Sequence, residues 1–203
     1  MKRVRLEDVL SSESGLFELR RLLADGGVAA VPTETFYALA ADPANDRGVA
    51  RVFEIKGRDD GKPLLVLFSN RDHLDRLGLD APEEILDPFF RIWPAPLTVV
   101  LPLALPIPAS RGRRDLAIRM PASPAVRKLL DAVGPLTGTS ANRSGASPLA
   151  DPDAVAAALG AEVDLLIDGG RTPGGVPSTI VDATGEPPVV LRPGAFPWPP
   201  CED

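Results

Sequence analysis

Three basic side chains that could bind an anion, Lys56, Arg58 and Lys62, lie within seven residues of each other in the run Lys-Gly-Arg-Asp-Asp-Gly-Lys-Pro at 56–63. The chain has four lysines, and two of them lie here. Two glycines in the run allow the backbone to approach a ligand closely, because they lack a Cβ atom. Three converging cations suit a polyanion such as a nucleoside triphosphate. The same charges are also typical of a solvated helix end, where cations complement the helix dipole.

Polar side chains also follow two apolar segments that we expect to be strands. Thr33, Glu34 and Thr35 come directly after the apolar residues 28–31, and a hydroxyl-rich run occupies residues 137–145. In α/β proteins, ligand-binding groups gather at such strand ends. The second run could hold a phosphate or a carboxylate through side-chain and amide hydrogen bonds. A turn that satisfies only its own backbone explains the same pattern, so both interpretations stay open.

Several well-known catalytic signatures are absent from the sequence. Residues 57–62 have the wrong spacing for the phosphate loop G-x-x-x-x-G-K-[ST], and Pro63 occupies the place of its hydroxyl residue. No G-x-G-x-x-G or H-E-x-x-H pattern occurs. The one histidine, His73, lies in a polar segment, so we expect a surface residue rather than a catalytic base. The one cysteine, Cys201, excludes an internal disulfide and a cysteine-rich metal site.

The composition is that of an ordinary globular domain. The 203 residues are 44% hydrophobic and 25% charged. A net charge of −6 argues against non-specific binding of the whole surface to nucleic acid or to an anionic membrane, although a basic pocket inside an acidic body would still select a small, highly charged ligand. The chain has no apolar run near the roughly 18 residues that cross a bilayer and no signal-peptide core, so we expect a cytoplasmic protein without membrane contact.

Apolar periodicity and capping signals predict helices and strands that alternate along the chain. The expected helices cover residues 16–23, 46–57, 71–77, 82–92, 123–132 and 151–160. We expect Asp46, Ser123 and Asp151 to cap the second, fifth and sixth of these helices. The expected strands cover residues 28–31, 64–68, 97–103, 115–120, 163–167, 178–181 and 189–191. This order indicates an α/β domain, placed at residues 1–196, and a proline-rich tail at 197–203 that we expect to run over the surface.

Seven short motifs follow one another between residues 32 and 194: Pro-Thr-Glu-Thr-Phe-Tyr-Ala-Leu at 32–39, Lys-Gly-Arg at 56–58 with Lys-Pro-Leu at 62–64, Trp-Pro-Ala-Pro-Leu-Thr at 93–98, Leu-Ala-Ile-Arg-Met-Pro at 116–121, Thr-Ser-Ala-Asn-Arg-Ser-Gly at 139–145, Ser-Thr-Ile at 178–180 and Leu-Arg-Pro-Gly at 191–194. Each is weak alone. Together and in this order they resemble the YrdC-like family, the threonylcarbamoyl-AMP synthases. The resemblance covers roughly residues 15–195 and implies a twisted mixed α/β sheet with helices packed on it and a deep basic cavity.

The resemblance also implies a reaction, in which L-threonine, bicarbonate and ATP give threonylcarbamoyl-AMP and pyrophosphate. The family's product feeds the threonylcarbamoyladenosine modification of tRNA, which makes the tRNA threonylcarbamoyl-transfer machinery the expected partner. A divalent metal, Mg²⁺ or Mn²⁺, is expected on the nucleotide phosphates, with no protein metal ligands. Nine residues follow Gly194, which suggests the short, single-domain form of the family.

The resemblance also implies site residues, which we assign at the positions where the motifs match. The expected catalytic set is Lys56, Arg58, Ser140 and Asn142. The residues expected to bind ATP are Arg58, Lys62, Ser140, Asn142 and Arg192, with Lys56 nearby to neutralise charge. The residues expected to bind threonine are Thr33, Thr35, Arg119, Thr139 and Ser178, and a guanidinium such as that of Arg119 suits a carboxylate.

Three residues depart from the family pattern: Asp59 stands where proline is common, Ala95 where glycine is usual, and Pro177 where many relatives have glutamate. None of them belongs to the expected catalytic set. Two other functions remain open. One is a YrdC-like module that contacts tRNA or other RNA weakly and performs no chemistry. The other is a related enzyme that transfers the carbamoyl group to an acceptor other than threonine.

Overall fold

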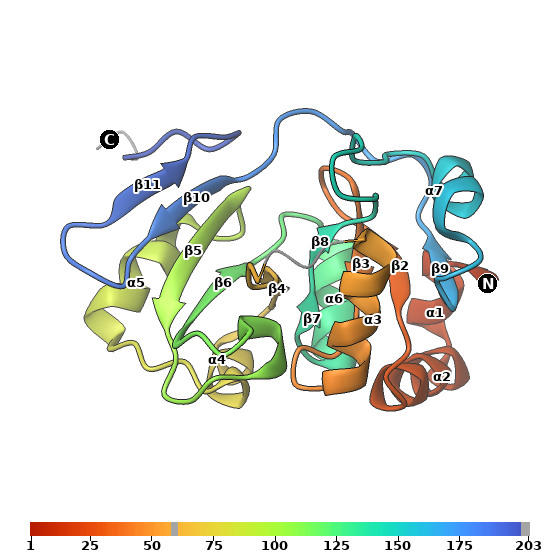
Figure 1. The fold of residues 1–203 in the computed structure, drawn as a ribbon, viewed down its shortest axis with the longest axis horizontal. Helices are drawn as coiled ribbons and strands as arrows, with labels where there is room; N and C mark the ends of the chain where they lie inside the picture. Colours follow the sequence, from red (N-terminus) through yellow and green to blue (C-terminus); the bar gives the residue numbers. More distant parts are fainter. Residues whose placement is uncertain (58–60, 200–203) are drawn as a thin grey trace.

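In the computed structural model, which describes residues 1–57 and 61–199, the strands form two mixed sheets that lie side by side (Figure 1). The first sheet has the order β1 (Lys2–Arg5), β9 (Leu165–Asp168), β2 (Ala29–Pro32), β3 (Tyr37–Ala40) and β8 (Thr139–Ser140). The second has the order β11 (Val189–Arg192), β10 (Thr179–Asp182), β5 (Leu97–Pro102), β6 (Asp115–Arg119), β4 (Val66–Leu67) and β7 (Leu136–Thr137). The α/β class is confirmed, and its strands are divided between these two sheets.

Helices cover both sheets. They are α1 (Leu6–Ser11), α2 (Glu13–Ala24), α3 (Asp46–Lys56), α4 (Arg71–Leu77), α5 (Glu83–Ile92), α6 (Pro124–Val133) and α7 (Pro152–Leu159), with a short 3-10 helix at Pro108–Ser110. No helix within the two described ranges combines the length and the apolar character that crossing a membrane would require.

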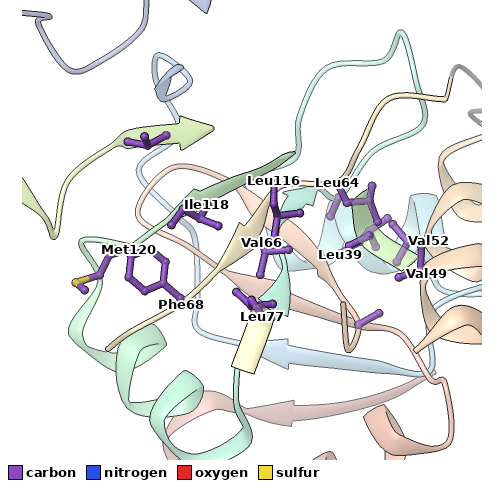
Figure 2. Close-up of a cluster of buried hydrophobic side chains, with 14 of the residues drawn as sticks. Leu39, Val49, Val52, Leu64, Val66, Phe68, Leu77, Leu116, Ile118 and Met120 are labelled. Carbon is purple, nitrogen blue, oxygen red and sulfur yellow. The ribbon is translucent and has the colours of Figure 1, made fainter. Parts of the chain in front are cut away.

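The strands β2 and β3 of the first sheet are buried on both faces, which explains why they are continuously apolar. Along β2, Ala29 and Val31 join one apolar cluster, together with residues of α1, α2 and α6. Ala30, between them, points to the other face and joins a second cluster with residues of α3 and α7. This second cluster also fills the space at the second sheet, where Figure 2 shows Val66, Ile118 and other apolar side chains meeting.

The chain passes from one sheet to the other at Gly138, between β7 and β8. The amide of Gly138 donates to the carbonyl of Leu65 at 2.7 Å. A Cβ atom added at Gly138 would lie 2.5 Å from Cγ of Leu67, a fully buried core residue. Glycine therefore allows the backbone to cross close to the core, and the crossing brings the hydroxyl-rich run after β7 to the junction of the two sheets.

Several expected helix ends are confirmed. Ser123 and Asp151 cap α6 and α7 through their side chains, and Gly57 ends α3 in the left-handed conformation with φ of 58°. The prediction that Asp46 caps α3 is wrong. The cap is Asn45, whose extended backbone lets its Oδ1 accept from the amide of Gly48 at 3.0 Å, while Asp46 is the first helical residue.

The tail packs against α5 through Trp198. The rings of Trp198 and Phe89 stack with their centroids 5.7 Å apart. Cys201 and the rest of residues 200–203 lie outside the described residues, as do Arg58, Asp59 and Asp60 of the basic run.

Candidate active site

A cavity of about 730 Å³ lies where the two sheets meet. The expected site residues that line it are Thr33, Thr35, Lys56, Lys62, Arg119, Thr139, Ser140, Asn142, Ser178 and Arg192. Arg58 completes the expected set, but it lies outside the described residues. Residues separated by up to 159 positions in the chain, Thr33 and Arg192, therefore reach one space.

The end of α3 and the loop after β8 hold each other in place. The last carbonyl groups of a helix lack partners within the helix. Here the carbonyl of Ile55 accepts from Nη1 of Arg143 at 3.1 Å, and the carbonyl of Lys56 accepts from the amide of Ser144 at 2.8 Å. Two motifs that are more than eighty residues apart thus satisfy each other's backbone groups.

The side chain of Lys56, at the end of α3, in turn contacts residues 140–142. Its ammonium group donates to the carbonyl of Ser140 at 2.7 Å, to the carbonyl of Asn142 at 3.1 Å and to Oδ1 of Asn142 at 3.3 Å. The residue is only 5% exposed. Sequence alone suggested a loop cation that neutralises nearby charge, whereas these contacts also make Lys56 a support of the 140–142 backbone.

The side chains of Ser140 and Asn142 are part of the same network. Oγ of Ser140 donates to Oδ1 of Asn142 at 2.6 Å. The side-chain nitrogen Nδ2 of Asn142 donates to the carbonyls of Arg143 and Ala146 at 2.9 Å and 2.6 Å. With its oxygen and nitrogen both engaged, Asn142 shapes the loop, and the Ser140 hydroxyl keeps its acceptor capacity for a group in the cavity.

Thr33 and Thr35 form a tight turn after β2. Oγ1 of Thr33 lies 2.7 Å from the carbonyl of Phe36, to which it donates, and 3.2 Å from the amide of Thr35, from which it accepts. The two threonine Oγ1 atoms are 3.2 Å apart. The turn satisfies its own backbone, and both threonines line the cavity, so ligand binding by this turn stays a prediction.

A hydroxyl pair and an arginine form the opposite wall. Oγ of Ser178 lies 2.9 Å from Oγ1 of Thr98, and Nη2 of Arg192 donates to the carbonyl of Ser178 at 2.7 Å. Burial of the guanidinium against this wall lowers the pKa of Arg192. The pair of strands β5 and β10 therefore fixes Ser178, and the edge strand β11 brings Arg192 to it.

Arg119, at the end of β6, is the most buried cation in this group, with 4% of its surface exposed. Burial lowers its pKa, the Glu34 carboxylate opposes that shift, and Arg192 adds to it. Nη2 of Arg119 lies 3.7 Å from Oε1 of Glu34, too far for a hydrogen bond. The guanidinium thus faces the cavity with hydrogen-bonding capacity left for a carboxylate.

Basic side chains outnumber acidic ones around the cavity, because among the described residues Lys56, Lys62, Arg113, Arg119 and Arg192 line it against Asp115 and Asp182. Asp115 is already paired with Arg113, at 2.5 Å. Within the described ranges, no three His, Cys, Asp or Glu side chains gather where they could hold a metal ion. Cations and hydroxyls suit phosphates.

The expected site residues leave out two polar residues, Thr98, which lines the cavity, and Glu34, which lies beside Arg119. The alternation of side chains along a strand could have identified Thr98. In β5, Thr98 and Val100 line the cavity, whereas Leu97 and Val99 point to the other face and are fully buried. Glu34 stood between two threonines that were selected, but its approach to Arg119 depends on a contact across 85 positions of the chain. No spacing rule reveals such a contact.

His73 is not the surface residue that its polar neighbours predict. It is 2% exposed, because α4 packs this side of its first turn inward. Its Nδ1 lies 3.3 Å from the amide of Ser69, from which it accepts, and burial lowers its pKa, with the charge of Arg76 adding to the shift. It is not among the residues that line the cavity.

The sequence is similar to those of known proteins. A model of the Sua5/YciO/YrdC family, described as telomere recombination, matches residues 21–194. The threonylcarbamoyl-AMP synthase of Pyrococcus abyssi is 38% identical over 178 residues, which are 86% of this chain and 52% of that protein. A putative threonylcarbamoyl-AMP synthase of Mycobacterium tuberculosis H37Rv is 33% identical over 83% of this chain and 79% of its own length.

The fold is also similar to that of a solved structure. The crystal structure of P. abyssi Sua5 complexed with L-threonine superposes with a TM-score of 0.83 at 36% identity, covering 97% of this chain and 57% of that one. The chain therefore spans about half the length of the P. abyssi relatives that it matches.

Proposed function

Because the chain belongs to the Sua5/YciO/YrdC family, we propose that it is a threonylcarbamoyl-AMP synthase, a nucleotidyltransferase that uses L-threonine, bicarbonate and ATP. The observation that carries the proposal is that ten residues from motifs scattered along the sequence line the same cavity. The P. abyssi relative bears the name of this enzyme, and its structure was solved with L-threonine. These facts about a relative support the choice of reaction and of amino acid.

The proposed site residues divide into two groups by their chemistry. Lys62, Arg58 and Arg192 carry the charge that a triphosphate needs, and the Ser140 hydroxyl can hydrogen bond to a phosphate. Lys56 and Asn142 hold the 140–142 backbone in position for that contact. These residues form the proposed nucleotide side, in whose catalytic set Arg58 and Ser140 contact the phosphates and Lys56 and Asn142 position them.

The other group suits an amino acid. Arg119 offers a buried guanidinium to the carboxylate, as two parallel hydrogen bonds to its two oxygens. The hydroxyls of Thr33, Thr35, Thr139 and Ser178 lie around the same space and can bond to the amine and the side-chain hydroxyl of threonine. The two groups share one cavity, so the amino acid and the α-phosphorus can be held in contact.

The proposed chemistry needs no nucleophile from the protein. The threonine amine attacks bicarbonate and forms a carbamate with loss of water. A carbamate oxygen then attacks the α-phosphorus of ATP, the bond between the α-phosphorus and its bridging oxygen breaks, and pyrophosphate leaves. The protein's contribution is to position the reactants and to stabilise charge on the phosphates. Mg²⁺ or Mn²⁺ brought by the nucleotide would share in that neutralisation.

The test is pyrophosphate formation by the purified chain with each substrate omitted in turn. We expect product only when threonine, bicarbonate and ATP are all present, and threonylcarbamoyl-AMP in the same amount as pyrophosphate. Arg58→Ala should lower the rate at least about a hundredfold. Arg171→Ala is the matched control, because this arginine is exposed and does not line the cavity. An Arg58→Ala enzyme that matches the parent would remove the role of that residue.

The same assay separates the other functions. Pyrophosphate release with another amino acid in preference to threonine would identify a different carbamoyl acceptor. An RNA mobility shift without any ATP turnover would identify a binding module. For the synthase we propose that the labile adenylate passes to the tRNA threonylcarbamoyl-transfer machinery in the cytoplasm, since both ATP and the tRNA acceptor are found there.

A further inference from the structure

The most unusual contact in the cavity wall is one that the proposed reaction leaves unexplained. Neither carboxylate oxygen of Glu34 has a hydrogen-bond partner, and neither does Nε of Arg119. Within residues 1–57 and 61–199, these three are the buried side-chain nitrogen and oxygen atoms without one. Buried polar groups in native proteins are nearly always paired, so a set of unpaired ones calls for an explanation, and a functional role is one.

The position of the pair supports this interpretation. Thr33 and Thr35, on either side of Glu34, both line the cavity, and so does Arg119. The Glu34 side chain is 15% exposed, while its carboxylate oxygens face inward, 3.7 Å from the guanidinium. Arg119 thus lies in the wall of the cavity, and the Glu34 carboxylate, which is not among the lining residues, lies behind it. The two charges are close enough to attract each other and too far apart to use up each other's hydrogen bonds.

The other charged residues of the cavity determine what the Glu34 charge does to ligand binding. Lys62 and Arg192 line it as cations, and the charge of Arg192 repels that of Arg119. A cavity lined by cations attracts every small anion, including bicarbonate, phosphate and pyrophosphate. The Glu34 carboxylate cancels much of the field of Arg119 at its own end, so a simple anion gains little there. A zwitterion gains more, because its carboxylate binds Arg119 while the buried charge of Glu34 behind Arg119 attracts its ammonium group.

We propose that Glu34 makes the Arg119 end of the cavity selective for a zwitterionic amino acid against anions that lack an amine. This proposal rests on the proposed function, which places an amino acid at Arg119. Glu34 acts as a specificity-determining residue, through the charge balance at Arg119, and it takes no part in the bond-making steps. Repulsion of the wrong ligand is as much a part of such selectivity as attraction of the right one.

The test compares two ligands by calorimetry, without turnover. L-Threonine carries an amine, and 3-hydroxybutyrate is the same molecule without it. The wild-type protein should bind threonine at least about tenfold more tightly than 3-hydroxybutyrate. Glu34→Gln keeps the shape and removes the charge, so threonine should bind more weakly, 3-hydroxybutyrate more tightly, and the preference should fall by about tenfold. Glu34→Asp should keep most of the preference.

Asp115→Asn is the matched control. It removes the same unit of charge at a carboxylate that lines the cavity directly and is paired with Arg113. The preference for threonine should survive this change if the position of the charge matters and should fall if the overall charge of the cavity matters. The latter result would overturn the proposal.

Other results would also overturn it. An unchanged preference in Glu34→Gln would show that the carboxylate has no part in selection, and an equal weakening of both ligands would show only a structural role. If Glu34→Gln does not fold, the wild-type protein and Glu34→Asp still test the proposal, because similar binding of both ligands contradicts it. Tight threonine binding with no effect of Glu34 leaves the proposed function intact, whereas no threonine binding by the wild type overturns the function itself.

Discussion

Replacing Lys56 by methionine tests whether this lysine holds the active-site loop in place. Methionine keeps most of the aliphatic volume, so the change removes the ammonium group without opening a large cavity. Three contacts disappear: those to the carbonyl of Ser140, the carbonyl of Asn142 and Oδ1 of Asn142. The two carbonyls then lose a donor in a region from which water is largely excluded, since Lys56 and Asn142 are 5% and 7% exposed.

The size of the effect follows from these contacts. A hydrogen bond from a charged donor contributes about 1.5–3 kcal/mol to stability. The three bonds share one ammonium group and do not add, and breaking one side of a buried charged network costs about 3–5 kcal/mol. We therefore expect the free energy of unfolding to fall by roughly 3 kcal/mol. In a domain of this size, that loss lowers Tm by about 6–12 °C.

Urea denaturation and thermal unfolding of both proteins measure this loss. Lys62→Met is the matched control, because Lys62 lines the same cavity but is exposed. It should change stability by less than about 1 kcal/mol while weakening ATP binding. If Lys56→Met were as stable as Lys62→Met and differed from the parent only in ATP affinity, Lys56 would act on the ligand and would not support the loop.

Three further predictions concern other parts of the structure. Ser140→Ala should weaken ATP binding about tenfold and threonine binding less; calorimetry that finds the reverse order contradicts the proposed nucleotide side. Gly194→Ala should destabilise the protein by about 1–3 kcal/mol, because its Cβ would lie 2.4 Å from backbone atoms that lead into β10; Gly185→Ala, with open space around it, should not. Stability should fall as the pH drops below 6.5, because burial holds the pKa of His73 below that value and the unfolded chain takes up the proton first. In His73→Asn the loss of stability between pH 7.5 and 5.5 should shrink, and an equal loss in both proteins would contradict this origin.

The helices show how much local sequence could predict. The N-caps Ser123 and Asp151 and the C-terminal Gly57 were identified correctly, because capping depends on residues within one turn. The choice between Asn45 and Asp46 failed, since either side chain can cap and only the backbone path at the helix start selects one. Such errors of one residue follow from the similar chemistry of neighbouring polar side chains.

Strands with strong apolar character were found, and weak ones were missed. β1 is a charged edge strand (Lys-Arg-Val-Arg), whose pairing with β9 reflects backbone hydrogen bonds across more than 160 positions. β3 (Tyr-Ala-Leu-Ala) has two alanines and no β-branched residue, yet it is fully buried between β2 and β8. Of the expected strand at residues 64–68, Val66 and Leu67 alone pair. Pairing partners far along the chain determine these elements, and no local pattern encodes them.

Residue types alone determined the chemistry available to this protein: cations and hydroxyls for phosphate and carboxylate, with one histidine, which does not line the cavity, and one cysteine. Short-range preferences and motif order were sufficient for the α/β class and for the choice of candidate residues. Folding determined how those residues are used. It turned Lys56 inward to support a loop, buried His73, and brought Glu34 beside Arg119, because burial and contact depend on which distant segments pack together, and that is a property of the whole chain.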